Sequence, residues 1–255
     1  KNSIIILAGI AMVYYIFKKV VSFYLKKAKS INTILLLSYL LRKELKLKAI
    51  NRIAFLINKQ NDNLVEIIIE KINKTFSPVR AKFYIKILLR IKNSPVSVII
   101  EKANYYKFRG DFIAKEMEIV KRNEKENSII IGELLYFLFA EDYKKAKMAA
   151  DIAKNYSNSL ILVPLKNILT KRKAIINNEK ILHFSLEIIE SFGPEAADFS
   201  AILKSLIINS DSHWLRYYAL KAYLAVASND KDYEEFIAHI KEVEEEPVIL
   251  ALDNK

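Results

Sequence analysis

Apolar residues recur every three or four positions along most of this chain, in short segments that polar residues separate. The segment Asn63–Ile91 shows the pattern in full. Its first part carries one helical stripe, formed by Leu64, Ile67, Ile68 and Ile72. Ser77 and Pro78 then suit an N-cap and the first position of a second helix, whose stripe consists of Val79, Phe83, Ile87 and Ile91. The pattern predicts a helical hairpin with two apolar faces that need neighbours to bury them.

A second hairpin of this kind is predicted over Gly193–Val226. Its stripes are formed by Phe199, Ile202, Leu203 and Leu206, and then by Leu215, Ala219, Ala222 and Val226. The turn between them, Asn209–Ser212, consists of residues that cap helices well. Hairpins of similar length fit most of the remaining chain, over Ile31–Gln60, Ser94–Arg122, Asn127–Tyr156 and Ser157–Phe192, with a polar terminal cap over Asp230–Glu246.

These segments predict an all-α fold, an α-solenoid of five to six helical hairpins with an apolar N-terminal helix. The expected division is an apolar helix at 1–29 followed by a helical repeat domain at 30–255. Glycine and proline are rare, with 4 and 5 residues among 255, which agrees with long helices. No strand-rich region is predicted, because the apolar runs lie within helical patterns.

The two clearest hairpins resemble HEAT repeats in their residues. After each turn an aliphatic residue and an arginine are followed by a small or apolar residue, in Val79-Arg80…Phe83 and in Leu215-Arg216…Ala219, and Asp211 lies in the later turn. HEAT-like arrays use a turn aspartate and a helix arginine to tie neighbouring repeats together, so the resemblance implies inter-repeat contacts for Arg80, Asp211 and Arg216. The stretch AEDYKKAKMAADIA is similar to the second helix of a TPR repeat, so both repeat classes stay open.

The charge is distributed unevenly along the chain. Residues 1–110 carry 22 basic and 5 acidic side chains, a net charge of +17, whereas residues 111–255 carry 19 and 24, a net charge of −5. A basic first half suits an anionic membrane surface or nucleic acid. The candidate contacts with an anionic surface are Lys18, Lys19, Lys26, Lys27, Lys82, Lys86 and Arg90, of which the last three form a row on one predicted helix.

The first apolar run, SIIILAGIAMVYYIF, has fifteen residues without a charge. As a helix it spans roughly 22 Å, less than the ~30 Å hydrocarbon core of a bilayer. However, apolar residues resume after Lys18 and Lys19, and lysines gather on the C-terminal side of the run. The positive-inside rule then predicts a single-pass membrane anchor with the repeat domain in the cytoplasm. The alternative is a helix buried in the fold of a soluble cytoplasmic protein.

No catalytic residue, metal site or cofactor is expected. The four glycines are isolated, so the chain lacks the glycine-rich patterns that bind phosphate groups. The three histidines, His183, His213 and His239, lack the spacing of metal ligands. The absence of cysteine excludes disulfides and thiolate sites. Trp214 is expected to pack at a repeat boundary.

The predicted function is that of a non-enzymatic, membrane-anchored scaffold that binds a protein partner in the groove of its solenoid. An alternative is a soluble basic solenoid that binds nucleic acid, with aromatic side chains stacking on single-stranded bases. The aromatic candidates for stacking are Tyr84, Tyr105, Tyr106 and Phe108. A third hypothesis follows from the resemblance alone, because one class of HEAT-like proteins excises alkylated DNA bases in a basic groove.

Overall fold

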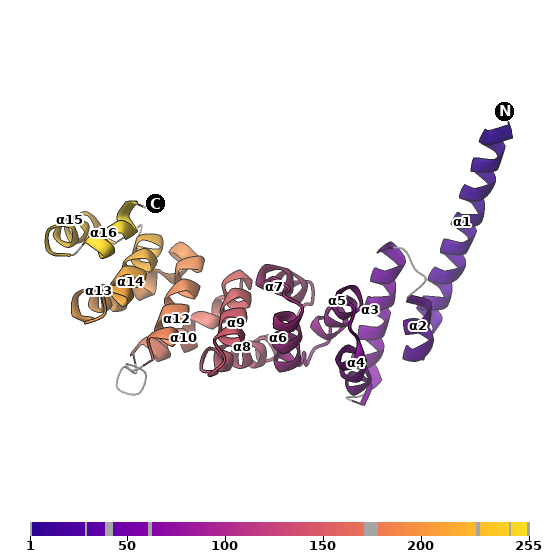
Figure 1. Ribbon diagram of the computed structural model, residues 1–255, viewed down its shortest axis with the longest axis horizontal. Coiled ribbons are helices and arrows are strands. Elements are labelled where there is room, and N and C mark those ends of the chain that lie inside the picture. Colours follow the sequence, from indigo (N-terminus) through magenta and orange to yellow (C-terminus); the bar gives the residue numbers. More distant parts are fainter. Residues whose placement is uncertain are drawn as a thin grey trace. The chain divides into compact units, whose positions relative to one another are not determined.

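The structure, a computed structural model, is helical in every regular element of the residues it describes (Figure 1). These are residues 2–28, 30–38, 43–60, 63–170, 178–227, 230–244 and 246–253. Within these ranges, the side chains of residues 2–11, 26, 36–38, 43, 60, 63 and 246 are not described. The predicted all-α class is therefore confirmed for the described part of the chain.

The helices group into two compact units, residues 1–102 and 103–255. The first unit contains α1 (Asn2–Lys27), α2 (Ile31–Ser38), α3 (Lys43–Gln60), α4 (Asn63–Lys74) and α5 (Pro78–Leu89). The second contains α7 (Gly110–Glu118), α8 (Glu124–Leu138), α9 (Tyr143–Asn155), η1 (Ser159–Ile161), α10 (Leu162–Thr170), α12 (Glu179–Phe192), η2 (Gly193–Phe199), α13 (Ser200–Asn209), α14 (His213–Val226), α15 (Tyr233–Val243) and α16 (Glu246–Asp253). Helix α6 (Val96–Tyr105) crosses the boundary between the units.

Capping residues begin the helices where the sequence predicts. Ser77 accepts a hydrogen bond from the N–H of Arg80, and Pro78 is the first residue of α5. In the same way, Ser212 accepts from the N–H of Leu215 at the start of α14. A capping side chain satisfies a backbone donor that the first helical turn leaves without a partner, so these boundaries follow from local chemistry.

The buried face of α5 differs from the predicted stripe. Ile87 and Ile91 are buried as expected, but Val79 is 72% exposed, next to the exposed Phe76 at the end of the hairpin. Tyr84 and Ile85 are buried instead. The reason is that α5 packs on both α3 and α4, so two sides of its middle turns are covered, while the residues of its first turn stay exposed.

In the second unit, packing contacts connect helices that are not adjacent along the chain. Helix α7 packs on α9, α9 on α12, α12 on α14, and α14 on α16 (Figure 1). Within the hairpins, α8 packs on α9 and α13 on α14. Each of α9, α12 and α14 is therefore covered on several sides, which leaves only a narrow strip of each helix exposed.

The first unit is centred on α3, which contacts α1, α2, α4 and α5. Helix α1 is attached through Val21 and Leu25, whose side chains are buried, while most of its other apolar side chains between residues 12 and 24 are exposed. In the described part of the chain, no helix combines the length and the apolar character needed to cross a bilayer. The predicted single-pass anchor is thus not supported.

Gly110 lies at a close approach between α7 and α9. A Cβ atom at this position would lie 2.6 Å from the backbone carbonyl carbon of Asp151. Such a separation is far below van der Waals contact, and a backbone atom cannot rotate away as a side chain can. The hairpin predicted over Ser94–Arg122 requires a break between its two helices, and the structure gives the packing reason for a glycine at the start of the second one.

We expect Gly110→Ala to lower the free energy of unfolding by about 1–3 kcal/mol, because α7 must move away from α9. Gly132→Ala is the matched control: a Cβ at that position of α8 meets nothing within 4 Å. Removing a glycine from a helix interior there should raise stability by about 0.5–1 kcal/mol. Urea unfolding of both variants measures the difference, and equal effects of the two substitutions would contradict the close-approach explanation.

Candidate functional site

Three helices of the second unit that pack on one another, α9, α12 and α14, carry a row of aromatic side chains in contact with one another. This aromatic row starts at Tyr143 on α9, crosses α12, and ends at Trp214 on α14. Ring-centre distances along it are 5.6 Å for Tyr143–Phe184, 5.4 Å for Phe184–His183, 3.9 Å for His183–Tyr218, 5.2 Å for Tyr218–Tyr217 and 6.3 Å for Tyr217–Trp214. Contacts between ring centres about 4.5–7 Å apart are favourable, and all of these distances except that of His183–Tyr218 fall in this range.

The position of the row follows from how the helices begin. Asp142 caps α9 by accepting from the N–H groups of Lys144 and Lys145, which places Tyr143 at the first helical position. Ser212 caps α14 and places Trp214 in its first turn. The two ends of the row are therefore fixed by capped turns and are exposed, whereas Phe184 in the middle is buried.

A cavity of about 410 Å³ opens beside the row between α12 and α14. It is lined by Glu179, Lys180, His183, Trp214, Leu215 and Tyr218. Lys180 is held at its edge by a hydrogen bond that its ammonium donates to the carbonyl oxygen of Ala140. The cavity thus has aromatic walls and a charged rim, an arrangement typical of sites that accept an apolar side chain.

Charged groups run along the exposed strip next to the aromatic row. Lys154 of α9 donates to Glu187 of α12 at 3.0 Å, and Nε2 of His183 lies 3.2 Å from the other carboxylate oxygen, without the alignment of a hydrogen bond. Contact with His183 and with the Lys154 ammonium lowers the pKa of Glu187 to about 2, against the opposing effect of burial. One turn further along the same strip of α12, Glu190 lies 3.3 Å from Lys221 of α14. Ion pairs therefore link all three helices.

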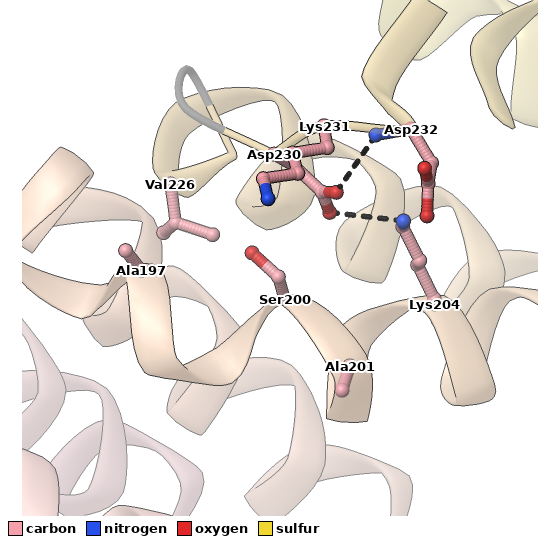
Figure 2. A pocket seen from close by; sticks show the side chains of 8 residues that line it. All are labelled: Ala197, Ser200, Ala201, Lys204, Val226, Asp230, Lys231 and Asp232. Atoms are coloured by element: carbon pink, nitrogen blue, oxygen red, sulfur yellow. Dashed lines mark hydrogen bonds and ion pairs between the residues drawn. The ribbon is translucent and has the colours of Figure 1, made fainter. Parts of the chain in front are cut away.

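A second cavity, of about 460 Å³, lies between α13 and the segment after α14. Figure 2 shows Lys204 and the backbone N–H of Asp232 reaching the carboxylate of Asp230, at 2.9 and 3.2 Å. The hydroxyl of Tyr223 donates to the same carboxylate at 3.1 Å. The Lys204 ammonium holds the pKa of Asp230 below its usual value, and burial together with the carboxylate raises the pKa of Tyr223.

The residues around Asp230 serve the fold. Tyr223 stacks on Tyr233 at 5.9 Å between ring centres and meets Phe236 edge-on at 5.0 Å. Lys204 lies over the Phe236 ring at 5.3 Å from its centre. The network therefore attaches α15 to the hairpin before it, and its polar groups satisfy one another.

The residues implied as inter-repeat contacts occupy different surroundings. Arg216 donates to Glu244 at 3.0 Å and to the carbonyl oxygen of Ser210 at 2.9 Å, so it joins the start of α14 to the end of α15. Asp211 contributes its carbonyl oxygen to Arg216, at 3.5 Å. Arg80 is exposed at the start of α5 and lines a cavity of about 470 Å³ with residues of α4.

The candidate contacts with an anionic surface also separate into groups. Lys18 forms an ion pair with Glu44, Lys19 and Lys27 lie over the rings of Tyr15 and Phe23, and the side chain of Lys26 is outside the described residues. On α5, Lys82 is exposed and Lys86 half-buried. Arg90 is only 7% exposed, and its guanidinium donates to Asn51 of α3. The row predicted on α5 is therefore interrupted, because Arg90 joins α5 to α3 inside the first unit.

The aromatic residues proposed to stack on nucleic acid are not presented together. Tyr84 is 2% exposed in the core of the first unit. Tyr105, Tyr106 and Phe108 form a cluster of their own, with ring centres 4.8 and 5.7 Å apart. A platform made of all four is thus excluded by the burial of Tyr84. Within the described residues, no group of three or more acidic or histidine side chains is placed to hold a metal ion.

The sequence interpretation missed the aromatic row. Trp214, expected to pack at a repeat boundary, is 58% exposed. A signal was present, because aromatic residues stand near the start of each of the three helices, in Tyr143, in His183-Phe184 and in Trp214 with Tyr217-Tyr218. That repetition has meaning only when the three helices are known to be neighbours.

No protein-family model, no curated protein and no solved structure matches this chain. The interpretation of the aromatic row therefore rests on its geometry.

We expect the Glu187 pairing to make stability depend on pH in the acid range. The folded-state pKa of about 2 lies below the ordinary 4.5, so the contribution is complete above about pH 4.5 and is lost as the pH falls towards 2. After allowance for screening by solvent, this contribution to the free energy of unfolding amounts to roughly 1–2 kcal/mol. Urea unfolding should show Glu187→Gln less stable than wild type above pH 5, with the gap closing near pH 2. Glu141→Gln, at an exposed turn, is the control; a gap independent of pH would contradict the assignment.

We expect the protein to become less stable when the side chain of Asp230 is removed. Asp230→Ala should lower the free energy of unfolding by about 1–3 kcal/mol, because Lys204 and the buried Tyr223 hydroxyl lose their acceptor. Tyr223→Phe, which removes one hydrogen bond, should lower it by about 0.5–1.5 kcal/mol. The exposed neighbour Asp232→Ala serves as control. Thermal unfolding with no difference between Asp230→Ala and Asp232→Ala would show that the network contributes nothing.

Proposed function

We propose that this chain is a helical-repeat scaffold of the HEAT or TPR kind, and that the aromatic row of its second unit binds a segment of a protein partner. The packing of each hairpin on the next supports the repeat interpretation, because repeat arrays form contacts mainly between neighbours. The role proposed is binding, not catalysis.

The observation that carries the proposal is the exposure of Trp214 at the end of a continuous aromatic row. Tryptophan and tyrosine dominate the binding energy of protein interfaces, because they bury a large area with little loss of side-chain freedom. Large contiguous apolar patches are uncommon on proteins that have no partner. Trp214 and Tyr143, both exposed, give such a patch two accessible ends.

The length of the row favours a peptide segment over a compact small molecule. Packed helices lie about 8–10 Å apart, so a row that crosses three of them extends over roughly 20 Å. An extended segment of about six residues has this length. The cavity between α12 and α14 would accept one large apolar side chain of that segment, with Glu179 and Lys180 at its rim.

The proposal is tested by selecting peptides from a random library on the full chain. We expect the selected peptides to contain an aromatic or large aliphatic residue, and to bind at least about tenfold more weakly to Trp214→Ala and to Tyr218→Ala. Calorimetry measures the affinities, and circular dichroism shows that each variant keeps its helices.

The matched control is Tyr136→Ala, which removes an exposed tyrosine of α8 outside the aromatic row. Its affinity for the same peptides should equal that of wild type. If Trp214→Ala and Tyr136→Ala bind the peptides equally well, or if the library yields no peptide that distinguishes them, the aromatic row is not the binding surface.

A further inference from the structure

A basic cavity lies between α1 and α3 in the first unit, far in sequence from the aromatic row and independent of its proposed role. Its volume is about 340 Å³. The lining combines three lysines with a hydroxyl and two aromatic rings, namely Lys18, Lys19, Lys48, Ser22, Tyr15 and Phe23. Cations and apolar rings therefore border the same space.

The ammonium groups are held near the cavity by neighbouring side chains. Lys48 of α3 donates to the hydroxyl of Ser22 at 2.9 Å, and the Lys19 ammonium lies 4.8 Å from the centre of the Tyr15 ring. Lys18 forms an ion pair with Glu44, the acidic residue at this point of α3. Three positive charges against one negative charge leave the cavity with a net charge of +2.

The cavity continues into an exposed apolar face of α1. Eight large apolar or aromatic side chains of this helix are between 49% and 68% exposed, namely Met12, Val13, Tyr15, Ile16, Phe17, Val20, Phe23 and Tyr24. Helix α1 contains no acidic residue. Lysines beside exposed aromatic and aliphatic side chains are the composition of helices that lie in the interface of a bilayer.

Charge and apolarity together select one class of occupant. Free phosphate would leave the aliphatic face in water, and so would a nucleic acid backbone. A second copy of the same face would bring lysine against lysine, in a unit that carries 20 basic and 5 acidic residues. An anionic phospholipid matches both the basic cavity and the apolar face, because its headgroup is negative and its acyl chains are apolar.

We propose that the cavity between α1 and α3 binds the phosphate of an anionic phospholipid, and that the exposed face of α1 lies against the acyl chains. Lys19, Lys48 and the Ser22 hydroxyl contact the phosphate, while Lys18 stays paired with Glu44. The side chains of Phe23 and Val20 enter the outer part of the hydrocarbon layer.

Flotation of the full chain with vesicles tests the proposal. We expect binding to mixed phosphatidylglycerol–phosphatidylcholine vesicles and little binding to phosphatidylcholine alone. Lys19→Gln combined with Lys48→Gln should weaken binding at least about tenfold, since each lysine near an anionic surface contributes roughly a factor of five. Phe23→Ser should weaken binding to the same vesicles without changing the charge.

The matched control is Lys82→Gln combined with Lys86→Gln, which removes the same charge from α5 in the same unit. The affinity of this double variant for the vesicles should fall by less than about threefold. An equal loss of vesicle affinity in the two double variants would show that binding depends on the total charge of the unit. This result would contradict the proposed site in the cavity. Soluble glycerol phosphate is added as a competitor at the same concentration of phosphate groups. If it displaces the protein from the vesicles, the ligand is a free phosphate ester, and the proposal of a lipid ligand is wrong.

Hydrogen exchange of the wild-type chain provides a measurement that needs no variant. Anionic vesicles should slow exchange over residues 12–24 of α1, and protection confined to other helices would contradict the proposal. If the chain alone forms dimers that Phe23→Ser dissociates, a second copy covers the exposed face of α1, and the lipid proposal is wrong.

Trp214→Ala should bind vesicles as the wild-type chain does. The lipid site and the aromatic row are therefore tested independently of each other.

Discussion

The packing of α12 between α9 and α14 is the contact on which the second unit depends. Half of the residues of α12 are buried, and the side chains left half-exposed include His183, Glu187 and Glu190, spaced four and three positions apart. On a helix this spacing places them along one line. The line lies within reach of lysines from both neighbours, so burial on two sides determines which residues can form ion pairs between helices.

The same strip that stabilises the unit also forms its candidate binding face. His183 contacts Glu187 on its own helix and Tyr218 on the next, and thereby connects the ion pairs to the aromatic row. A ligand that covers the row would also exclude water from these charges, which strengthens their attraction. In the proposed function, His183 therefore belongs both to the contacts that hold the three helices together and to the binding surface.

Helix boundaries could be predicted from the sequence because they depend on residues next to one another. Ser77, Pro78 and Ser212 act on backbone groups within three residues, and the structure places them as expected. The buried face of α5 could not be predicted in full, since it depends on α3 and α4 acting at once. Arg90 illustrates the limit: an i, i+4 row of basic residues indicates an exposed face, yet the guanidinium finds its acceptor in Asn51, 39 positions earlier. For the site, the inter-repeat role of Arg216 was expected by resemblance, but its acidic contact, Glu244, follows 28 positions later.

The two proposed surfaces draw on different physical forces, which is consistent with the distribution of charge. The first unit carries a net charge of +15, and residues 103–255, with 21 basic and 24 acidic side chains, carry −3. Attraction between the first unit and an anionic surface weakens with salt, whereas burial of Trp214 and its neighbours in an interface does not. Because the second unit has almost no net charge, it is not drawn to the same surface by long-range forces. The partner segment proposed for the second unit is therefore expected to bind through close contact with the aromatic row, so that shape and not charge selects it.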